Sequence, residues 1–224
     1  MQSLPEFIDR HDAGRRLAEA LVHLRGSNPI VLALPRGGVP VGFEVARALD
    51  ADLDVLIVRK IGAPGHEELG IGAIVGGPRP ELVLNEDVAQ MVGASSRYVE
   101  MEKARQLTEI ERRKLVYRGD RPSPSVAGRT VIVVDDGIAT GSTMKAALKA
   151  LRRMDPARLV LAVPVAPPDS IAALASECDE VVCLSQPWPF FAVGAHYADF
   201  RQTEDSEVVR LLAEARRPSQ MSAT

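Results

Sequence analysis

Short apolar runs and longer segments of helical spacing alternate along this chain, and the alternation predicts its fold. Runs rich in valine, isoleucine and leucine are typical of strands buried on both faces of a parallel sheet. They occupy residues 30–34, 53–58, 81–85, 131–134, 158–165 and 180–184. Segments typical of helices occupy residues 13–25, 40–49, 95–117, 144–154 and 169–176. Strands that alternate with helices predict an α/β fold with right-handed crossovers.

The ends of these elements suggest how the chain is organised. Asp12 precedes the first helix and is predicted to be its N-cap, because aspartate accepts the unpaired N–H groups of a first turn. A helical excursion at about 85–118, for a hood or a dimer contact, ends in a Pro- and Ser-containing linker at 121–125. We expect one domain over residues 1–216 and a disordered tail at 217–224.

The segment VIVVDDGIATGST, residues 131–143, says most about function. Its short strand ends at two adjacent carboxylates, Asp135 and Asp136, and a loop of small and hydroxyl residues leads into a helix. Such a loop lets backbone N–H groups approach an anion, and the helix adds the positive end of its dipole. The loop can hold a phosphate, and the two acids can hold neighbouring hydroxyls or a hard cation. A ribose 5-phosphate site requires both. The alternative is an ordinary strand–turn–helix unit with solvated acids.

This segment resembles the signature of type I phosphoribosyltransferases, which use phosphoribosyl pyrophosphate (PRPP). The resemblance implies a three-layer α/β/α fold, with a mostly parallel central sheet and a small hood subdomain. It also implies that the catalytic acids Asp135 and Asp136 contact the ribose 2′- and 3′-hydroxyls and hold Mg²⁺, directly or through water. The residues that would wrap the 5-phosphate are Ala139, Thr140, Gly141, Ser142 and Thr143.

The loop after the first strand has anion-binding chemistry too. Open α/β sheets bind ligands at the carboxyl ends of their strands. Gly37 and Gly38 let N–H groups face an anion, and Arg36 adds a guanidinium suited to pyrophosphate. The loop resembles the family's pyrophosphate loop, in which we predict a cis Arg36–Gly37 bond. The alternative is a tight turn with a surface arginine.

Arg59 and Lys60 close the second strand, and the Gly-rich segment 61–80 that follows predicts a mobile lid. It resembles the flexible catalytic loop of the orotate branch of the family. The resemblance implies that Arg59 and Lys60 bind pyrophosphate oxygens and that His66 neutralises the leaving group. The gap from Lys60 to His66 is longer here, and Ala-Pro-Gly at 63–65 replaces the family's mid-loop lysine. A solvated loop tip is the alternative for His66.

Aromatic residues gather in PWPFFAVGAHYADF, residues 187–200. Its F-A-V-G run resembles the base-binding segment of purine phosphoribosyltransferases, which implies that Phe191 stacks on the acceptor. A hydrophobic strap packed on the sheet is the alternative. Ala139 stands where the 6-oxopurine branch places an aspartate, which argues against a hypoxanthine or guanine acceptor.

Composition narrows the partners. A net charge of −3 gives no global attraction to nucleic acid or membrane, and no apolar run approaches a membrane span. No apolar stretch follows Met1, and Cys178 and Cys183 are typical of reduced thiols. We expect a cytoplasmic homodimer that binds PRPP and a nucleobase-like acceptor, with no nucleic acid and no membrane partner.

The leading hypothesis is a Mg²⁺-assisted enzyme that transfers the 5-phosphoribosyl group of PRPP to a nitrogenous base or amine. Pyrophosphate leaves through an oxocarbenium-like transition state, as in glycoside chemistry. The alternative is a non-catalytic PRPP-sensing regulator, which usually needs a nucleic-acid surface that this mildly acidic chain does not suggest. A generic phosphosugar-binding protein leaves the paired loops unexplained.

Overall fold

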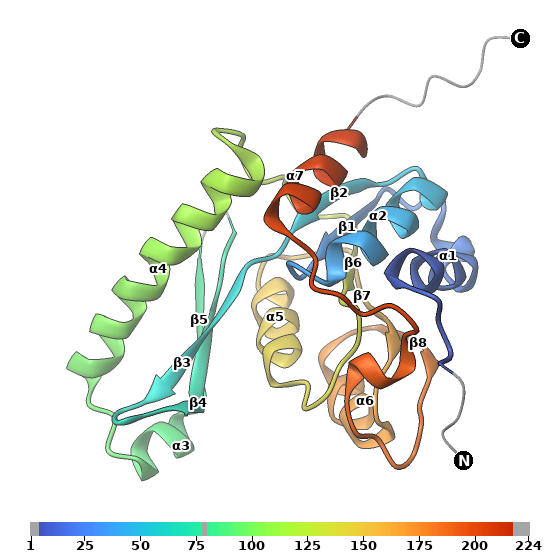
Figure 1. Ribbon diagram of the computed structural model, residues 1–224. Coiled ribbons are helices and arrows are strands. Elements are labelled where there is room, and N and C mark those ends of the chain that lie inside the picture. Colours follow the sequence, from blue (N-terminus) through green and yellow to red (C-terminus); the bar gives the residue numbers. More distant parts are fainter. Residues whose placement is uncertain (1–4, 78–79, 217–224) are drawn as a thin grey trace, which may run out of the picture.

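The computed structural model describes residues 5–77 and 80–216, whose strands form a five-stranded and a three-stranded sheet (Figure 1). The larger, core sheet is parallel throughout, in the order β2-β1-β6-β7-β8. Its strands are β1 (Pro29–Ala33), β2 (Asp52–Val55), β6 (Thr130–Val134), β7 (Arg158–Val165) and β8 (Glu180–Ser185). All five strands run in one direction, so their carboxyl ends meet at one edge.

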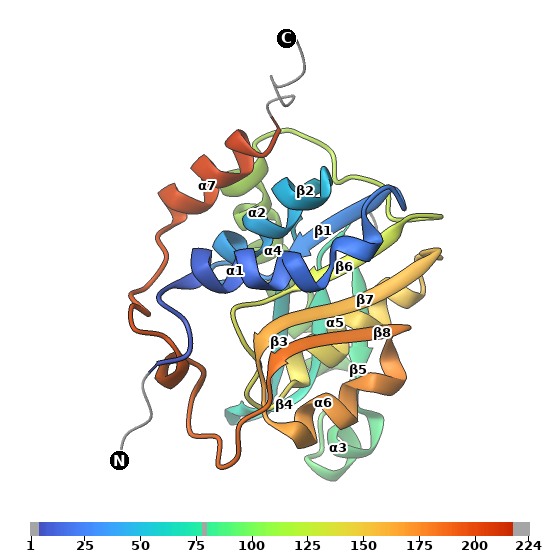
Figure 2. The same cartoon turned by 90° about the vertical axis from the view of Figure 1, so that its right-hand side faces the viewer.

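The core sheet is buried on both faces, as its apolar runs predict. Val31 and Ala33 of β1 pack in the cluster that includes the helices α1 and α2, whereas Ile30 and Leu32 pack in the cluster that includes α5. Figures 1 and 2 show α1 and α2 on one side of this sheet and α5 on the other. The helices around the core sheet are α1 (Arg10–Ala20), α2 (Gly38–Leu49), α5 (Ser142–Arg152), α6 (Pro168–Leu174) and α7 (Asp205–Glu214). The three-layer α/β/α fold is confirmed.

The hood is an antiparallel sheet in the order β3-β4-β5, together with α3 and α4. Figure 1 shows its sheet between the long helix α4 and α5. The hood elements are β3 (Val58–Ala63), β4 (His66–Val75), β5 (Glu81–Leu84), α3 (Glu86–Met91) and α4 (Ser96–Arg118). The predicted helical excursion at about 85–118 thus corresponds to α3 and α4, which belong to the hood.

The glycine-rich lid differs from its prediction. Most of segment 61–80 is paired backbone, because β3 and β4 form a hairpin from the pair Val58↔Val75 to the pair Ala63↔His66. The single strand predicted at 53–58 is wrong for the same reason. The chain leaves the core sheet after Val55 and enters the hood sheet at Val58.

The first helix begins earlier than predicted. Asp9, not Asp12, is its N-cap, since the Asp9 side chain accepts the N–H of Asp12. Asp12 instead accepts the N–H of Ile8 from within the first turn. The helix ends at Ala20, and a short 3-10 turn over Val22–Leu24 follows. The predicted N-cap is therefore wrong by one helical turn.

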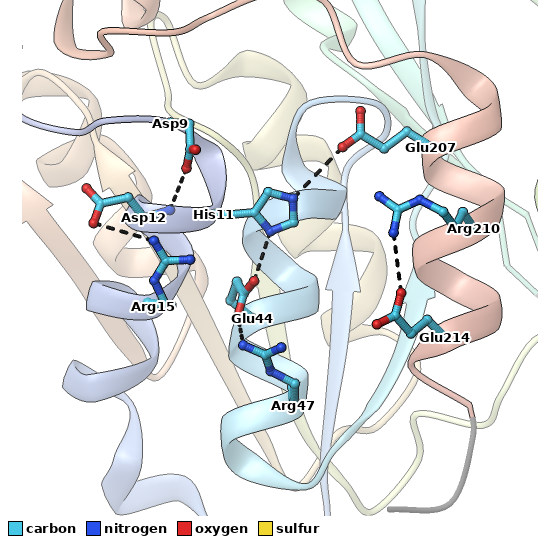
Figure 3. A network of polar contacts seen from close by, with 9 residues as sticks. All are labelled: Asp9, His11, Asp12, Arg15, Glu44, Arg47, Glu207, Arg210 and Glu214. Atoms are coloured by element: carbon cyan, nitrogen blue, oxygen red, sulfur yellow. Dashed lines mark hydrogen bonds and ion pairs between the residues drawn. The ribbon is translucent and has the colours of Figure 1, made fainter.

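Helix α7 was not predicted, although Val208, Leu211 and Leu212 have helical spacing and are buried. His11 of α1 ties this helix to the core (Figure 3). His11 Nδ1 lies 2.9 Å from Glu44 of α2, and Nε2 lies 3.9 Å from Glu207 of α7. The predicted tail at 217–224 lies outside the described residues.

A buried ion pair joins the hood to the core. Arg118, the last residue of α4, donates to Asp54 of β2 at 2.7 Å, and both side chains are buried.

Within the described residues no helix is long and apolar enough to cross a membrane. Cys178 and Cys183 are free thiols.

Candidate active site

The signature segment lies at the carboxyl edge of the core sheet. Strand β6 ends at Val134, the acids follow, and α5 begins at Ser142. Gly141 has a φ of +74°, the left-handed region that glycine favours, and is the N-cap residue of α5. The Ser170 hydroxyl of α6 donates to the Ala139 carbonyl at 2.6 Å and so holds the loop. The loop therefore leads into a helix N-terminus, where the first N–H groups of α5 can meet an anion.

The two acids have different surroundings. Arg10 donates from Nε to Asp136 Oδ2 at 2.8 Å, and 14% of the Asp136 side chain is exposed. Burial raises the pKa of Asp136, and Arg10 opposes that rise. Burial raises the pKa of Asp135 well above its ordinary value, and the neighbouring Asp136 carboxylate raises it further. A second positive charge or a hydroxyl donor at this pair would relieve the electrostatic cost.

Two residues at the acids escaped the sequence prediction. Besides Asp136, the Arg10 guanidinium donates to the Arg201 carbonyl at 2.7 Å and stacks over the Phe200 ring at 4.0 Å. The Tyr197 hydroxyl donates to the Asp136 carbonyl at 2.5 Å. No local motif could reveal these contacts, because Arg10 and Asp136 lie 126 positions apart. The aromatic cluster at 187–200 was a signal only for Tyr197 and Phe200.

The predicted pyrophosphate loop touches the acids. A Cβ on Gly37 would collide with the Asp136 carboxylate, whose Cγ would lie 2.7 Å away. A Cβ on Gly38 would lie 2.9 Å from the Asp135 Cα. Glycine is therefore required at both positions, since neither neighbour leaves room for a side chain. The loops after β1 and β6 meet because these two strands are neighbours in the core sheet.

The cis peptide bond predicted at Arg36–Gly37 is wrong by one position, because the cis bond joins Pro35 to Arg36. The Arg36 side chain is one-third exposed and lies 4.0 Å from the Glu204 carboxylate. Arg36 is therefore a partly exposed cation of this loop, and its ion pair with Glu204 is weak.

The predicted pair Arg59 and Lys60 divides between two faces of the hood sheet. Successive residues of a strand point to opposite sides. Arg59 accordingly faces α4, where its Nε donates to the Gln106 side chain at 3.0 Å. Lys60 instead lines a cavity of about 690 Å³ between the hood and α5. The residues of the signature loop that line the same cavity are Thr140, Ser142 and Thr143.

His66 lies at the hairpin tip and is exposed. It is not among the residues that line the cavity shared by Lys60 and the phosphate loop. Of these two predicted residues, the structure therefore places Lys60, and not His66, at the cavity beside the phosphate loop.

The aromatic segment 187–200 covers part of the signature loop. A Cβ on Gly137 would lie 2.5 Å from Val193 Cγ1, so the two segments pack closely. Phe191 is 85% exposed, which leaves its ring free to contact a ligand. The packing at Val193 agrees with the strap alternative for this segment, whereas stacking by Phe191 stays a prediction.

The acids were also predicted to hold a metal. In residues 5–77 and 80–216, no group of three or more His, Cys, Asp and Glu side chains gathers as a metal site. Oxygen donors suit Mg²⁺, which keeps several non-protein ligands. The donor set fits Mg²⁺ only if a ligand and water supply the remaining oxygens.

Comparison with known proteins identifies the family of this chain. The family model described as "Phosphoribosyl transferase domain" matches residues 8–199. Two Mycobacterium tuberculosis proteins, named "Putative phosphoribosyl transferase MT0597" and "Putative phosphoribosyl transferase Rv0571c", are each 48% identical over 211 residues. These alignments cover 94% of this chain but 47% of each relative, so the chain spans about half their length.

A solved structure is similar over nearly its whole length. The crystal structure of TT1426 from Thermus thermophilus has a TM-score of 0.82 and 47% identity. The match covers 93% of this chain and 98% of that one. The family model alone spans far more than half of the sequence. The chain belongs to the phosphoribosyl transferase domain family.

Proposed function

We propose that the chain binds PRPP and transfers its 5-phosphoribosyl group to a nitrogenous base or amine, with release of pyrophosphate. One observation carries the proposal: Gly37 and Gly38 lie directly against Asp136 and Asp135, one loop away from the N-terminus of α5. A diol-binding acid pair thus stands between two anion-binding loops. PRPP has the same order of groups, with a 5-phosphate, a ribose diol and a pyrophosphate.

The 5-phosphate has a site in the loop over residues 139–143. Thr140 is exposed, and its hydroxyl lies 3.5 Å from that of Ser142. Hydroxyl donors and the first N–H groups of a helix are the usual partners of a phosphate. The ribose would then lie toward Asp135 and Asp136, whose carboxylates accept hydrogen bonds from the 2′- and 3′-hydroxyls.

Lys60 lines the cavity beside the phosphate loop, as do Lys145 and Lys149 of α5. In this proposal the Lys60 ammonium neutralises phosphate charge there. The roles of Arg36, Arg59 and His66 toward pyrophosphate stay predictions. Arg59 would first have to leave Gln106, which holds it on the opposite face of the hood.

Mg²⁺ belongs to the proposal as a partner of PRPP. Asp135 and Asp136 would supply oxygens, either directly or through water, while PRPP oxygens supply the rest. Bound in this way, Mg²⁺ would neutralise part of the charge on the departing pyrophosphate. Arg10 already pairs with Asp136, so the acids alone are a weak site for a free cation.

The chemistry needs positioning more than strong acids or bases. The bond between C1 and the pyrophosphate oxygen breaks, positive charge builds on the ribose ring, and an acceptor nitrogen bonds to C1. Fixing the 5-phosphate and the diol places C1, and the carboxylates stabilise the positive ring. Phe191 would stack on a flat acceptor held beside the same segment.

A pyrophosphate-release assay tests the proposal. The protein is incubated with PRPP, Mg²⁺ and each of a panel of nucleobases and amines, beside an Asp135→Asn/Asp136→Asn control. We expect release with at least one acceptor, not hypoxanthine or guanine, and none from the control. PRPP binding without turnover would support the PRPP-sensing alternative instead. Absence of both binding and turnover would contradict the proposal, and sedimentation of the same sample tests the predicted homodimer.

A further inference from the structure

Arg10 makes three contacts that converge on the candidate ribose site. Its Nε donates to Asp136 at 2.8 Å, its Nη1 donates to the Arg201 carbonyl at 2.7 Å, and its guanidinium lies 4.0 Å from the Phe200 ring centre. Only 11% of the side chain is exposed. A planar guanidinium held by a carboxylate, a carbonyl and a ring has one available orientation.

The geometry of Asp136 shows what this orientation achieves. The Arg10 hydrogen bond uses Oδ2, which leaves the other carboxylate oxygen, Oδ1, outside that contact. Tyr197 fixes the main chain of the same residue through its carbonyl. Gly37 lies against the Asp136 carboxylate and has no side chain that could displace the carboxylate. Side chain and backbone of Asp136 are thus both held, from elements far apart in the sequence.

A structural role alone would not require this arrangement. Arg16, on the same helix, also stacks on an aromatic ring, at 5.5 Å from the Phe7 centre, and pairs with Asp12 at 2.9 Å. These Arg16 contacts lie within α1 and the segment just before it, and the Arg16 side chain is 46% exposed. Arg10 differs because its carboxylate partner is one of the two acids at the end of β6. That difference separates a general helix anchor from a residue that acts on the site.

We infer that Arg10 is a positioning residue, which holds the Asp136 carboxylate toward the ribose diol; this inference rests on the proposed function. Arg10 need not touch the ligand. The Arg10 guanidinium holds the Asp136 carboxylate in one place, so that Oδ1 can accept a hydroxyl while Asp135 accepts its neighbour. Lysine would keep the charge but could not make the two hydrogen bonds and the stack together.

The test compares ribose 5-phosphate with 2-deoxyribose 5-phosphate by isothermal titration calorimetry. Removal of the 2-hydroxyl breaks the diol that the acid pair shares. Loss of one hydrogen bond to a charged group weakens the affinity for a ligand about tenfold or more. We expect the wild type to prefer ribose 5-phosphate by that factor. Arg10→Met should bind the two sugars within about twofold of each other, because the phosphate loop alone then holds both.

Matched variants separate positioning from folding. Arg16→Met should keep the wild-type preference, and Arg10→Lys should show an intermediate one. Melting temperatures identify any variant that is unfolded. If Arg10→Met is unfolded, Arg10→Lys is compared with the wild type instead, and its preference for ribose 5-phosphate should be clearly lower. A wild-type preference for ribose 5-phosphate in folded Arg10→Met would overturn the inference and leave the proposed function standing. The same result in Arg10→Lys would do so if Arg10→Met is unfolded. Wild-type protein that binds neither sugar phosphate would overturn both.

Discussion

Replacing Arg118 by methionine should loosen the joint between hood and core. Arg118 donates to Asp54 at 2.7 Å, to the Val55 carbonyl at 2.7 Å and to the Ser123 hydroxyl at 2.5 Å. Arg216 lies 3.9 Å from the same Asp54 oxygen and attracts it less strongly. Methionine keeps the apolar stem of the side chain, so the change removes mainly the charge and its hydrogen bonds.

The expected loss follows from burial. Asp54 is 2% exposed and Arg118 6%, and Oδ2 of Asp54 has no hydrogen-bond partner within the described residues. Removing one partner of a buried ion pair costs about 3–5 kcal/mol, because it leaves an uncompensated charge. Set against a typical unfolding free energy of about 5–15 kcal/mol, this is a large share. With a urea slope of about 3 kcal/mol per M, the midpoint should fall by about 1–1.7 M.

Urea unfolding followed by circular dichroism measures this loss. Arg112→Met is the matched control, because Arg112 lies on the same helix in an exposed pair with Glu109, and its midpoint should stay unchanged. The double variant Asp54→Leu/Arg118→Met should lose less than Arg118→Met alone, since the stranded carboxylate is gone.

The loss should also depend on pH. Burial raises the pKa of Asp54 above its ordinary value even with Arg118 present, and removing Arg118 raises it further. A folded-state pKa above the unfolded one gives stability that is present at low pH and lost as pH rises through the folded value. Arg118→Met should therefore lose less at pH 5 than at pH 8. A midpoint equal to that of Arg112→Met at both values would refute the reasoning.

Three further outcomes follow. Glu44 raises the pKa of His11, so that pair stabilises the fold below about pH 6.5, and its contribution is lost as pH rises through the raised value. Urea unfolding should show the deficit of His11→Asn at pH 5.5 and little at pH 9; a constant deficit contradicts this. Gly37→Ala should displace the Asp136 carboxylate and weaken PRPP binding about tenfold or more, as measured by calorimetry. Unchanged affinity would show that the contact between Gly37 and Asp136 has no role in PRPP binding. Phe191→Ala should raise the KM of an accepted base about fivefold to a hundredfold at constant melting temperature, whereas a lower melting temperature at constant KM indicates a structural strap.

The sequence was sufficient wherever one local pattern had one physical solution. Valine-rich runs are typical of strands buried on both faces of a covered parallel sheet, and β1 and β6 are fully buried as predicted. Parallel strands then bring their carboxyl ends to one edge, so the sequence predicts that the loops after residues 30–34 and 131–134 share that edge. The contact of Gly37 and Gly38 with Asp136 and Asp135 comes from the structure. The fold and the shared edge of these two loops follow from such rules.

Contacts set by tertiary packing were beyond this reasoning. Arg10 carries no motif, and its partner Asp136 is known only once α1 is packed beside the sheet. The opposite faces of Arg59 and Lys60 follow from the strand β3, which the glycine-rich sequence concealed. Helix α7 had a weak but usable signal in its three buried aliphatic residues.

The central claim is that the acids at the end of β6 belong to a PRPP site, and calorimetry with PRPP and Mg²⁺ tests it most directly. The wild type should bind PRPP, whereas Asp135→Asn/Asp136→Asn should show no measurable binding while it keeps the wild-type circular dichroism spectrum. Such a result would locate the ribose at these two side chains. Equal PRPP affinity in the folded double variant would contradict the account.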